Sequence, residues 1–293
     1  MKGAFFQIIR SILYALLRLC SYPLRGITYL LLNHLIQYRK AIVKSNLDRA
    51  FSKLSVAERK RIKNQFYLHF AAYLLETIEL MVINRGQLLK RITISKASLD
   101  ALKRHYEQKK PVIILAGHNF NWEYCSIFPI LLDHKVLVSY KTLRSPFWNR
   151  VIQNLRGRFG ATMVDHKSIY LSLHRFKRSG EVTLTWLGGD QMPKWSRDTL
   201  IAENFLGQPT YFFNGLNEIA RKTESVVYFQ DIRKTSASTY EVELKLISEA
   251  PQKETAHFVT REYARLLEQL ILEQPANWLW SHKRWKKVPD VVS

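Results

Sequence analysis

The sequence predicts an α/β fold with a mixed, largely parallel central sheet flanked by helices, and an N-terminal membrane-associated helical hairpin. Short apolar runs alternate with helical patterns, which is typical of parallel sheets. The amino-terminal segment is strongly apolar apart from regularly spaced arginines. We therefore divide the chain into membrane-associating helices at 1–37 and a single α/β domain at 38–293. The apolar runs expected to be buried strands are 111–116, 136–140, 161–164, 182–187 and 225–230.

The amino-terminal segment is the first predicted element. Arg10, Arg18 and Arg25 are eight and seven residues apart, about two helical turns each, so they share one stripe of a helix. Pro23 is expected to end this helix before a second one at Ile27–Ile36. The arginines interrupt any run of ~18 uncharged apolar residues, and no signal-peptide cleavage site follows. We expect a hairpin in the membrane interface with its arginines on lipid phosphates. One alternative is that the helix packs on the protein core while its arginines snorkel to solvent. The other is that it crosses the membrane as a single spanning helix.

The body of the chain begins with a basic helix at 38–50. Ser55 and Glu58 form a capping-box pattern that predicts the start of a long amphipathic helix over 56–83. Apolar and polar residues alternate in Tyr240–Ile247, which predicts an edge strand. In a parallel sheet the functional site lies beyond the carboxyl ends of the strands. Further helices are expected at 121–133, 145–157, 167–178, 211–222 and 255–273.

The charge balance indicates an anionic partner. Lys and Arg number 45 against 24 Asp and Glu, a net charge of +21. In the amino-terminal segment and in the tail at 278–289, the cations alternate with apolar and aromatic residues. This mixture favours a lipid–water interface, so Trp280 and Trp285 are expected to contact membrane. A nucleic-acid-binding protein is the alternative class, but no pattern of a nucleic-acid-binding motif occurs. We expect no nucleic acid partner.

The two cysteines, Cys20 and Cys125, exclude a disulfide framework or a Cys-rich zinc site. We expect no bound metal, since the histidines show no metal-ligand spacing. Cys125 is close in sequence to a histidine and a glutamate, but its apolar neighbours favour a core position over a thiol nucleophile.

The candidate catalytic residues follow the first strand of the domain. His118 comes directly after Gly117 at the strand end, and Asn121 is placed to cap the next helix. If His118 lies in the turn, Glu123 in the first helical turns can reach its ring and fix the tautomer. The other ring nitrogen could then take a proton from a substrate hydroxyl. A structural histidine at a helix cap is the alternative.

These residues carry a resemblance to a known family. Gly117–Glu123, Gly-His-Asn-Phe-Asn-Trp-Glu, resembles the HxxxxD/E block of the lysophospholipid acyltransferase superfamily, in the form found in late (lauroyl/myristoyl-type) acyltransferases of lipid A biosynthesis. Other blocks are similar in the same order: Arg39-Lys40 with Asn46-Leu47 and Phe51, Tyr140–Pro146, Leu155–Gly160, Asp190-Gln191 with Phe205–Pro209, and Trp278–Trp285.

The resemblance implies an enzyme, an O-acyltransferase that moves a fatty acyl chain from a thioester to a hydroxyl without an acyl-enzyme. His118 would be the general base and Glu123 its orienting carboxylate. Arg156 would bind phosphate or stabilise the oxyanion. Lys141 and Leu206 depart from the family's Arg and Phe at those positions. The full set of candidate acceptor or oxyanion residues is Asn121, Lys141, Arg144, Arg156, Asp190 and Gln191.

The resemblance also implies the partners. We expect an anionic lipid acceptor, with a lipid A precursor preferred and another glycolipid, aminolipid or lysophospholipid as the alternative. The acyl donor would be acyl carrier protein or acyl-CoA, acting as co-substrate, and no cofactor is expected. The expected location is the cytoplasmic face of the cell inner membrane, in peripheral or monotopic association.

Overall fold

A seven-stranded sheet forms the centre of the molecule, in a computed structural model that describes residues 2–193 and 199–289. The strand order is β1-β9-β8-β2-β5-β3-β4. β8 and β9 pair antiparallel and the other neighbours pair in parallel, which confirms the predicted mixed, largely parallel sheet. The strands are β1 (Ile92–Ile94), β2 (Val112–Ala116), β3 (Lys135–Tyr140), β4 (Thr162–Asp165), β5 (Thr183–Gly188), β8 (Val226–Lys234) and β9 (Tyr240–Ser248).

All five predicted buried strands form, but β9 is not the edge strand that its alternation predicted. It lies between β8 and β1, and β1 occupies the edge. The alternation in β9 instead marks a strand with one buried and one more exposed face. Strand β1 has only three residues, which is too short for a periodic signal in the sequence.

Helices cover both faces of the sheet. Ile113 and Leu115 of β2 point into a core formed with α11 (Phe258–Glu273) and the C-terminal tail. Val112 and Ile114 point to the other face, into a second core formed with α6 (Lys96–Glu107) and α7 (Phe128–Leu131). This division explains why β2 is apolar at every position. The helices of the domain are α5 (Arg85–Leu89), α6 (Lys96–Glu107), α7 (Phe128–Leu131), α8 (Pro146–Gly157), α9 (Ile169–Arg178), α10 (Gly215–Thr223) and α11 (Phe258–Glu273), with short 3-10 helices η2 (Trp122–Ile127) and η4 (Pro251–Lys253).

A separate two-stranded sheet, β6 (Leu200–Phe205) and β7 (Gln208–Phe213), was not predicted. The helix predicted at 211–222 begins only at Gly215, as α10 (Gly215–Thr223). Leu206 and Gly207 make the tight turn with φ values of 53° and 69°, a conformation that favours glycine. The buried guanidinium of Arg284 lies 4.7 Å from the Phe212 ring centroid, so this small sheet packs on the tail of the chain.

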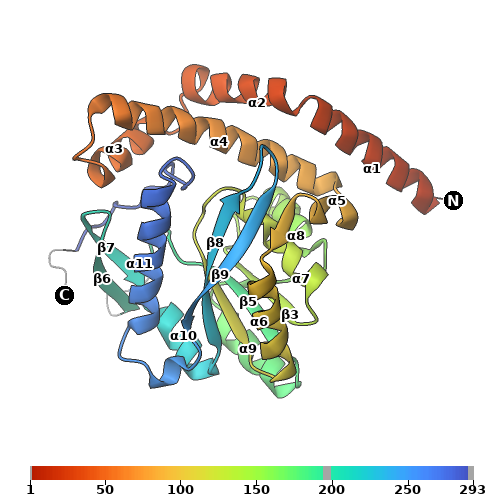
Figure 1. Ribbon diagram of the computed structural model, residues 1–293, viewed down its shortest axis with the longest axis vertical. Helices are drawn as coiled ribbons and strands as arrows, with labels where there is room; N and C mark the ends of the chain where they lie inside the picture. Colours follow the sequence, from red (N-terminus) through yellow and green to blue (C-terminus); the bar gives the residue numbers. More distant parts are fainter. Residues whose placement is uncertain (1, 194–198, 290–293) are drawn as a thin grey trace.

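Helix α4 (Val56–Val82) connects the domain to the amino-terminal helices and matches its predicted bounds closely. Its capping box is confirmed, because Ser55 Oγ accepts from the Glu58 amide and the Ser55 amide donates to Glu58 Oε2. Figure 1 shows α4 lying across the edge of the domain, with α1 (Lys2–Leu19) and α2 (Ser21–Leu30) along its outer side. A π-helical turn (Leu31–Leu35) and α3 (Lys40–Ala50) complete this layer.

The two amino-terminal helices do not form the predicted hairpin. In Figure 1, α2 continues roughly along the direction of α1 after a bend. The helix is interrupted at Cys20, and Pro23 lies inside the first turn of α2. A proline is tolerated there because the first helical amides have no intrahelical acceptor.

The arginine stripe faces the protein, so the expectation that it faces lipid phosphates is wrong in this structure. Arg10 donates to the Val82 and Ile83 carbonyls, Arg18 to Ser238 Oγ, and Arg25 to the Leu68 carbonyl. Turning these cations inward leaves an apolar outer surface. Its exposed members are Ile9, Ile12, Leu13, Leu16, Leu19, Tyr22, Ile27 and Leu30. In the described part of the chain, none of the helices has the length and hydropathy required to cross a bilayer.

The tail tryptophans are also buried, which corrects the expectation that Trp280 and Trp285 contact membrane. Trp280 has no exposed surface and donates to the Pro275 carbonyl. Trp285 donates to Thr210 Oγ1 in β7 at 2.8 Å. Aromatic side chains of this size supply a large apolar area to a core, and the indole N–H groups here find acceptors inside the protein.

Candidate active site

The candidate site is built where β2 and β5 end side by side. In the register of this parallel pair, Ala116 lies opposite Gly188, so the turns that follow both strands meet at one edge of the sheet. His118 is the second residue after β2, and Asp190 is the second after β5. A Cβ at Gly117 would lie 2.5 Å from Asn119 Oδ1 and 2.6 Å from Leu267 Cδ1, so a larger residue here would displace these two side chains.

Asp190 holds His118 through both the ring and the backbone. His118 Nδ1 lies 2.6 Å from Asp190 Oδ1, and the His118 amide donates to Asp190 Oδ2 at 2.8 Å. Trp278 Nε1 donates to the same Oδ2 at 2.7 Å. Burial alone would raise the pKa of Asp190, but His118 and these hydrogen bonds hold that pKa well below its usual range. An ionised Asp190 fixes the tautomer with hydrogen on Nδ1.

Glu123 was predicted to orient the His118 ring, and in the structure Asp190 takes that place. Glu123 instead forms a bidentate ion pair with Arg156 of α8. Arg156 Nε lies 2.7 Å from Glu123 Oε2, and Arg156 Nη2 lies 2.8 Å from Oε1. The physical reason is local: His118 lies before a 3-10 helix whose first turn directs Glu123 into the protein. The neighbouring charge of Glu123 raises the pKa of Arg156 against the opposing effect of burial.

The second ring nitrogen of His118, Nε2, is the one that Asp190 does not contact. Gln191 Nε2 lies 3.3 Å from it, and the Trp122 ring packs edge-on with its centroid 4.8 Å from that of His118. Gln191 is exposed and His118 is partly exposed. The predicted pair of Asp190 and Gln191 is thus brought to the two opposite nitrogens of His118.

Asn121 was predicted to contact substrate, but it is buried and turned inward. Its Oδ1 accepts from the Glu123 amide and caps the 3-10 helix, while its Nδ2 donates to Glu76 Oε2 in α4. Glu76 also accepts from the Tyr240 hydroxyl at 2.8 Å. Burial raises the pKa of Glu76. This polar cluster ties α4 to the turn that carries His118, and both polar atoms of the Asn121 side chain are engaged in it.

The remaining predicted residues lie farther from His118. Lys141 and Arg144 are exposed on the loop after β3, the second strand from β2. Cys125 is fully buried, and burial raises the pKa of its thiol to about 12, as expected for a core residue and not for a nucleophile.

The tail supplies residues that sequence reasoning did not assign to the site. The indole of Trp278 bonds Asp190, Asn119 and Trp278 form an antiparallel bridge, and the Phe120 amide donates to the Asn277 carbonyl. The aromatic composition of this segment suggested a membrane contact, because a tryptophan-rich, basic tail has the same composition as an interfacial anchor.

His282 gives a testable pH dependence. Its Nε2 accepts from the Met192 amide, and burial lowers its pKa to about 4. A histidine whose pKa is lower when folded contributes stability that is complete above about pH 6.5 and is lost toward pH 4.

Wild type should therefore lose roughly 2–3 kcal/mol more stability between pH 7.5 and pH 4.5 than His282→Gln, whose amide oxygen can also accept from Met192. Urea unfolding at the two pH values measures the difference. Equal losses in the two proteins would contradict the assignment.

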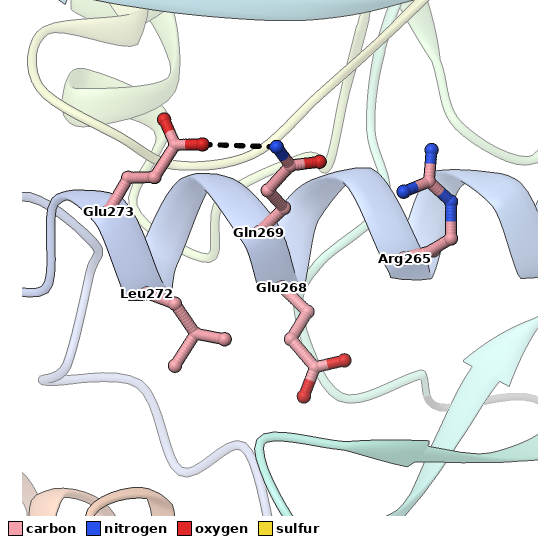
Figure 2. A pocket seen from close by; sticks show the side chains of 5 residues that line it. All are labelled: Arg265, Glu268, Gln269, Leu272 and Glu273. Carbon is pink, nitrogen blue, oxygen red and sulfur yellow. Dashed lines mark hydrogen bonds between the residues drawn. The ribbon is translucent and has the colours of Figure 1, made fainter.

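A shallow depression on α11 is not connected to this chemistry. Arg265, Glu268, Gln269, Leu272 and Glu273 line it, and Figure 2 shows them along one side of the helix. Gln269 donates to Glu273, and Glu268 accepts from the Leu206 amide. Arg265 also pairs with Glu262, and Glu273 with Arg233, so these groups already have partners in the protein and leave no convergent polar set for a substrate.

A comparison with protein-family models agrees with the motifs. A family model described as bacterial lipid A biosynthesis acyltransferase matches residues 7–287. The crystal structure of the 1-acyl-sn-glycerophosphate (LPA) acyltransferase PlsC from Thermotoga maritima is similar at 14% identity and a TM-score of 0.36. The match covers 92% of this chain and 99% of that one. No curated protein sequence matches the chain significantly.

Proposed function

Because the chain belongs to the bacterial lipid A biosynthesis acyltransferase family and is therefore an acyltransferase, we propose that it transfers a fatty acyl chain from an acyl thioester to a hydroxyl of a lipid A precursor. The observation that carries this proposal is the His118–Asp190 pair at the carboxyl ends of β2 and β5. A histidine with one nitrogen fixed by a buried carboxylate and the other not in contact with it is suited to general-base catalysis.

In the proposed mechanism, His118 Nε2 takes the proton of the acceptor hydroxyl as its oxygen attacks the thioester carbonyl. The oxygen–carbon bond forms, and the carbonyl becomes a tetrahedral oxyanion. When this collapses, the carbon–sulfur bond breaks, and the imidazolium returns the proton to the thiolate. Asp190 stabilises the imidazolium through Nδ1–H. No acyl-enzyme is needed, and the nearby Cys125 is buried with a pKa of about 12.

Arg156 and Gln191 are the proposed stabilisers of negative charge. Glu123 occupies Nε and Nη2 of Arg156, which leaves Nη1 to donate to the oxyanion or to an acceptor phosphate. The Gln191 amide beside His118 Nε2 is placed to donate to the acceptor oxygen. Lys141 and Arg144 would hold acceptor phosphates. The acyl donor is acyl carrier protein or acyl-CoA, both anionic thioesters that suit a chain of +21 charge.

The test of function compares membrane lipids by mass spectrometry. Cells without the protein and cells carrying only His118→Ala should both accumulate a lipid A precursor that lacks one acyl chain. Loss of an acyl chain from another glycolipid, aminolipid or lysophospholipid would keep the chemistry and replace the acceptor. Normal lipids in the His118→Ala strain, with the variant folded, would refute His118 as the base.

We also propose that the protein acts at the cytoplasmic face of the inner membrane and binds it through the apolar outer surface of α1 and α2. Ile12 is 54% and Leu16 52% exposed, as expected for side chains that enter a bilayer interface.

The variant Ile12→Glu/Leu16→Glu is expected to move most of the protein from the membrane to the soluble fraction. It leaves the inward bonds of Arg10 and Arg18 intact, so the fold should persist. Fractionation, with circular dichroism of the released protein, checks this outcome. A folded variant that still sediments with membranes would contradict the assignment.

A further inference from the structure

An exposed apolar group lies outside the amino-terminal helices, on the loop after β3. We call residues 141–148, which are the loop after β3 together with the first turn of α8, the aromatic loop. Within it Leu143 is 43%, Phe147 67% and Trp148 57% exposed. Single exposed apolar residues are ordinary, but three within six positions, two of them aromatic, mark an interaction surface.

The aromatic loop is held in one conformation by its own hydrogen bonds. Thr142 Oγ1 donates to Asp165 Oδ2 at 2.7 Å, and the Leu143 amide donates to Asn149 Oδ1 at 3.0 Å. Ser145 caps α8 by accepting from the Trp148 amide. The Phe147 and Trp148 rings meet edge-to-face, with centroids 5.2 Å apart. These bonds fix the backbone and leave the three apolar side chains directed away from the core.

The aromatic loop lies at the same edge of the sheet as the active site. β3 pairs with β5 and β5 pairs with β2, all in parallel, so the end of β3 is about 10 Å from the end of β2. α8, whose first turn belongs to the aromatic loop, also reaches the amino-terminal layer. Arg158, directly after α8, and Arg10 of α1 both donate to the Ile83 carbonyl. The Ile83 carbonyl therefore connects α1 to the end of α8, the helix whose first turn belongs to the aromatic loop.

The charge of the aromatic loop is complementary to an anionic surface. Lys141, Arg144 and Arg150 are exposed, and no acidic residue occurs between 141 and 150. Tryptophan and phenylalanine flanked by cations match the interface of a bilayer, where aromatic rings lie at headgroup level and cations meet phosphates. An acidic carrier protein would also bind the cations, but charge complementarity alone does not explain why Phe147 and Trp148 are exposed.

We infer that the aromatic loop is a second membrane-docking point, which inserts Leu143, Phe147 and Trp148 into an anionic leaflet while Lys141 and Arg144 contact lipid phosphates. This inference rests on the membrane association proposed above and adds its orientation. With α1, α2 and the loop all on the bilayer, the carboxyl edge of the sheet and His118 face the lipid. A lipid hydroxyl could then reach Nε2 without leaving the leaflet.

The experiment measures binding of the full chain to vesicles of phosphatidylethanolamine with about one-third phosphatidylglycerol. Phe147→Ser/Trp148→Ser should bind at least about tenfold more weakly than wild type, since two large apolar side chains lose their burial. Leu272→Ser is the matched control, because Leu272 is 54% exposed on α11 (Figure 2), outside the proposed surface. It should bind like wild type.

Tryptophan fluorescence distinguishes insertion from a carrier-protein contact. Brominated lipids should quench wild type more than Trp148→Phe, because Trp148 is the exposed tryptophan among those of the described residues and the others described are buried. Equal quenching, together with unchanged vesicle binding by the serine double variant, would overturn the inference. The same variant weakening only carrier-protein binding would also overturn it. Both outcomes leave the test of Ile12 and Leu16 unaffected, so failure here is distinct from failure of membrane association.

Discussion

Replacing Asp190 with asparagine is expected to lower kcat by about 10³- to 10⁴-fold, as when the carboxylate that orients a catalytic histidine is lost. Asp190 Oδ2 accepts from the His118 amide and from Trp278 Nε1, so an asparagine oxygen would occupy that place. Its NH₂ group would then face Nδ1 of His118. The ring would have to accept there and carry its hydrogen on Nε2. In that tautomer Nε2 cannot take a proton from the acceptor hydroxyl.

The measurement is single-turnover acyl transfer from a thioester donor to a lipid acceptor, over a range of pH. Glu123→Gln tests the other candidate carboxylate, which contacts Arg156 and not His118. Because it also unpairs Arg156, only the pKa that governs kcat/KM is compared with wild type, and urea unfolding first establishes that the variant is folded. In Glu123→Gln that pKa should stay at its wild-type value, whereas in Asp190→Asn it should move. If Glu123→Gln shifts that pKa and Asp190→Asn does not, Glu123 orients the base, as the sequence had suggested.

The difference between these two carboxylates shows where sequence reasoning ends. The strands could be predicted because apolar runs and their spacing are local properties, and His118 could be found because it follows a strand and a glycine. The partner of His118 depends on the pairing of β2 with β5, which brings together residues 72 positions apart. Glu123 is near His118 in the sequence, and nothing local shows that its first helical turn points inward to Arg156.

The amino-terminal layer and the tail show the same limit for composition. Arginines among leucines, and tryptophans among lysines, predict contact with lipid. In the structure Arg10 and Arg25 instead satisfy carbonyl groups of α4, and Trp280 fills the core. Arginine and tryptophan are compatible with both a membrane interface and a protein interior, so composition cannot distinguish the two. Tertiary packing determines which of them each side chain contacts. Among the tryptophans of the described residues, Trp148 is the exposed one, although no sequence pattern predicts that it contacts lipid.

Breaking the Glu123–Arg156 ion pair is expected to destabilise the fold by about 3–5 kcal/mol, the usual cost of leaving one buried charge unpaired. The side chain of Glu123 is 1% exposed and that of Arg156 is 14% exposed, so water cannot replace the missing partner. Arg156→Ala should show this loss in urea unfolding. It should also lower kcat/KM by about 10²-fold if Arg156 stabilises the oxyanion.

The double variant Glu123→Leu/Arg156→Met separates these two effects. Replacing both charges with apolar groups of similar volume should recover most of the stability, because no buried charge is left unpaired. Activity should remain as low as in Arg156→Ala, since the guanidinium is still missing. Recovery of stability and activity together would show that Arg156 acts only through the fold. Failure to recover stability would mean that the pair holds the turn of His118 by its geometry, which apolar side chains cannot reproduce.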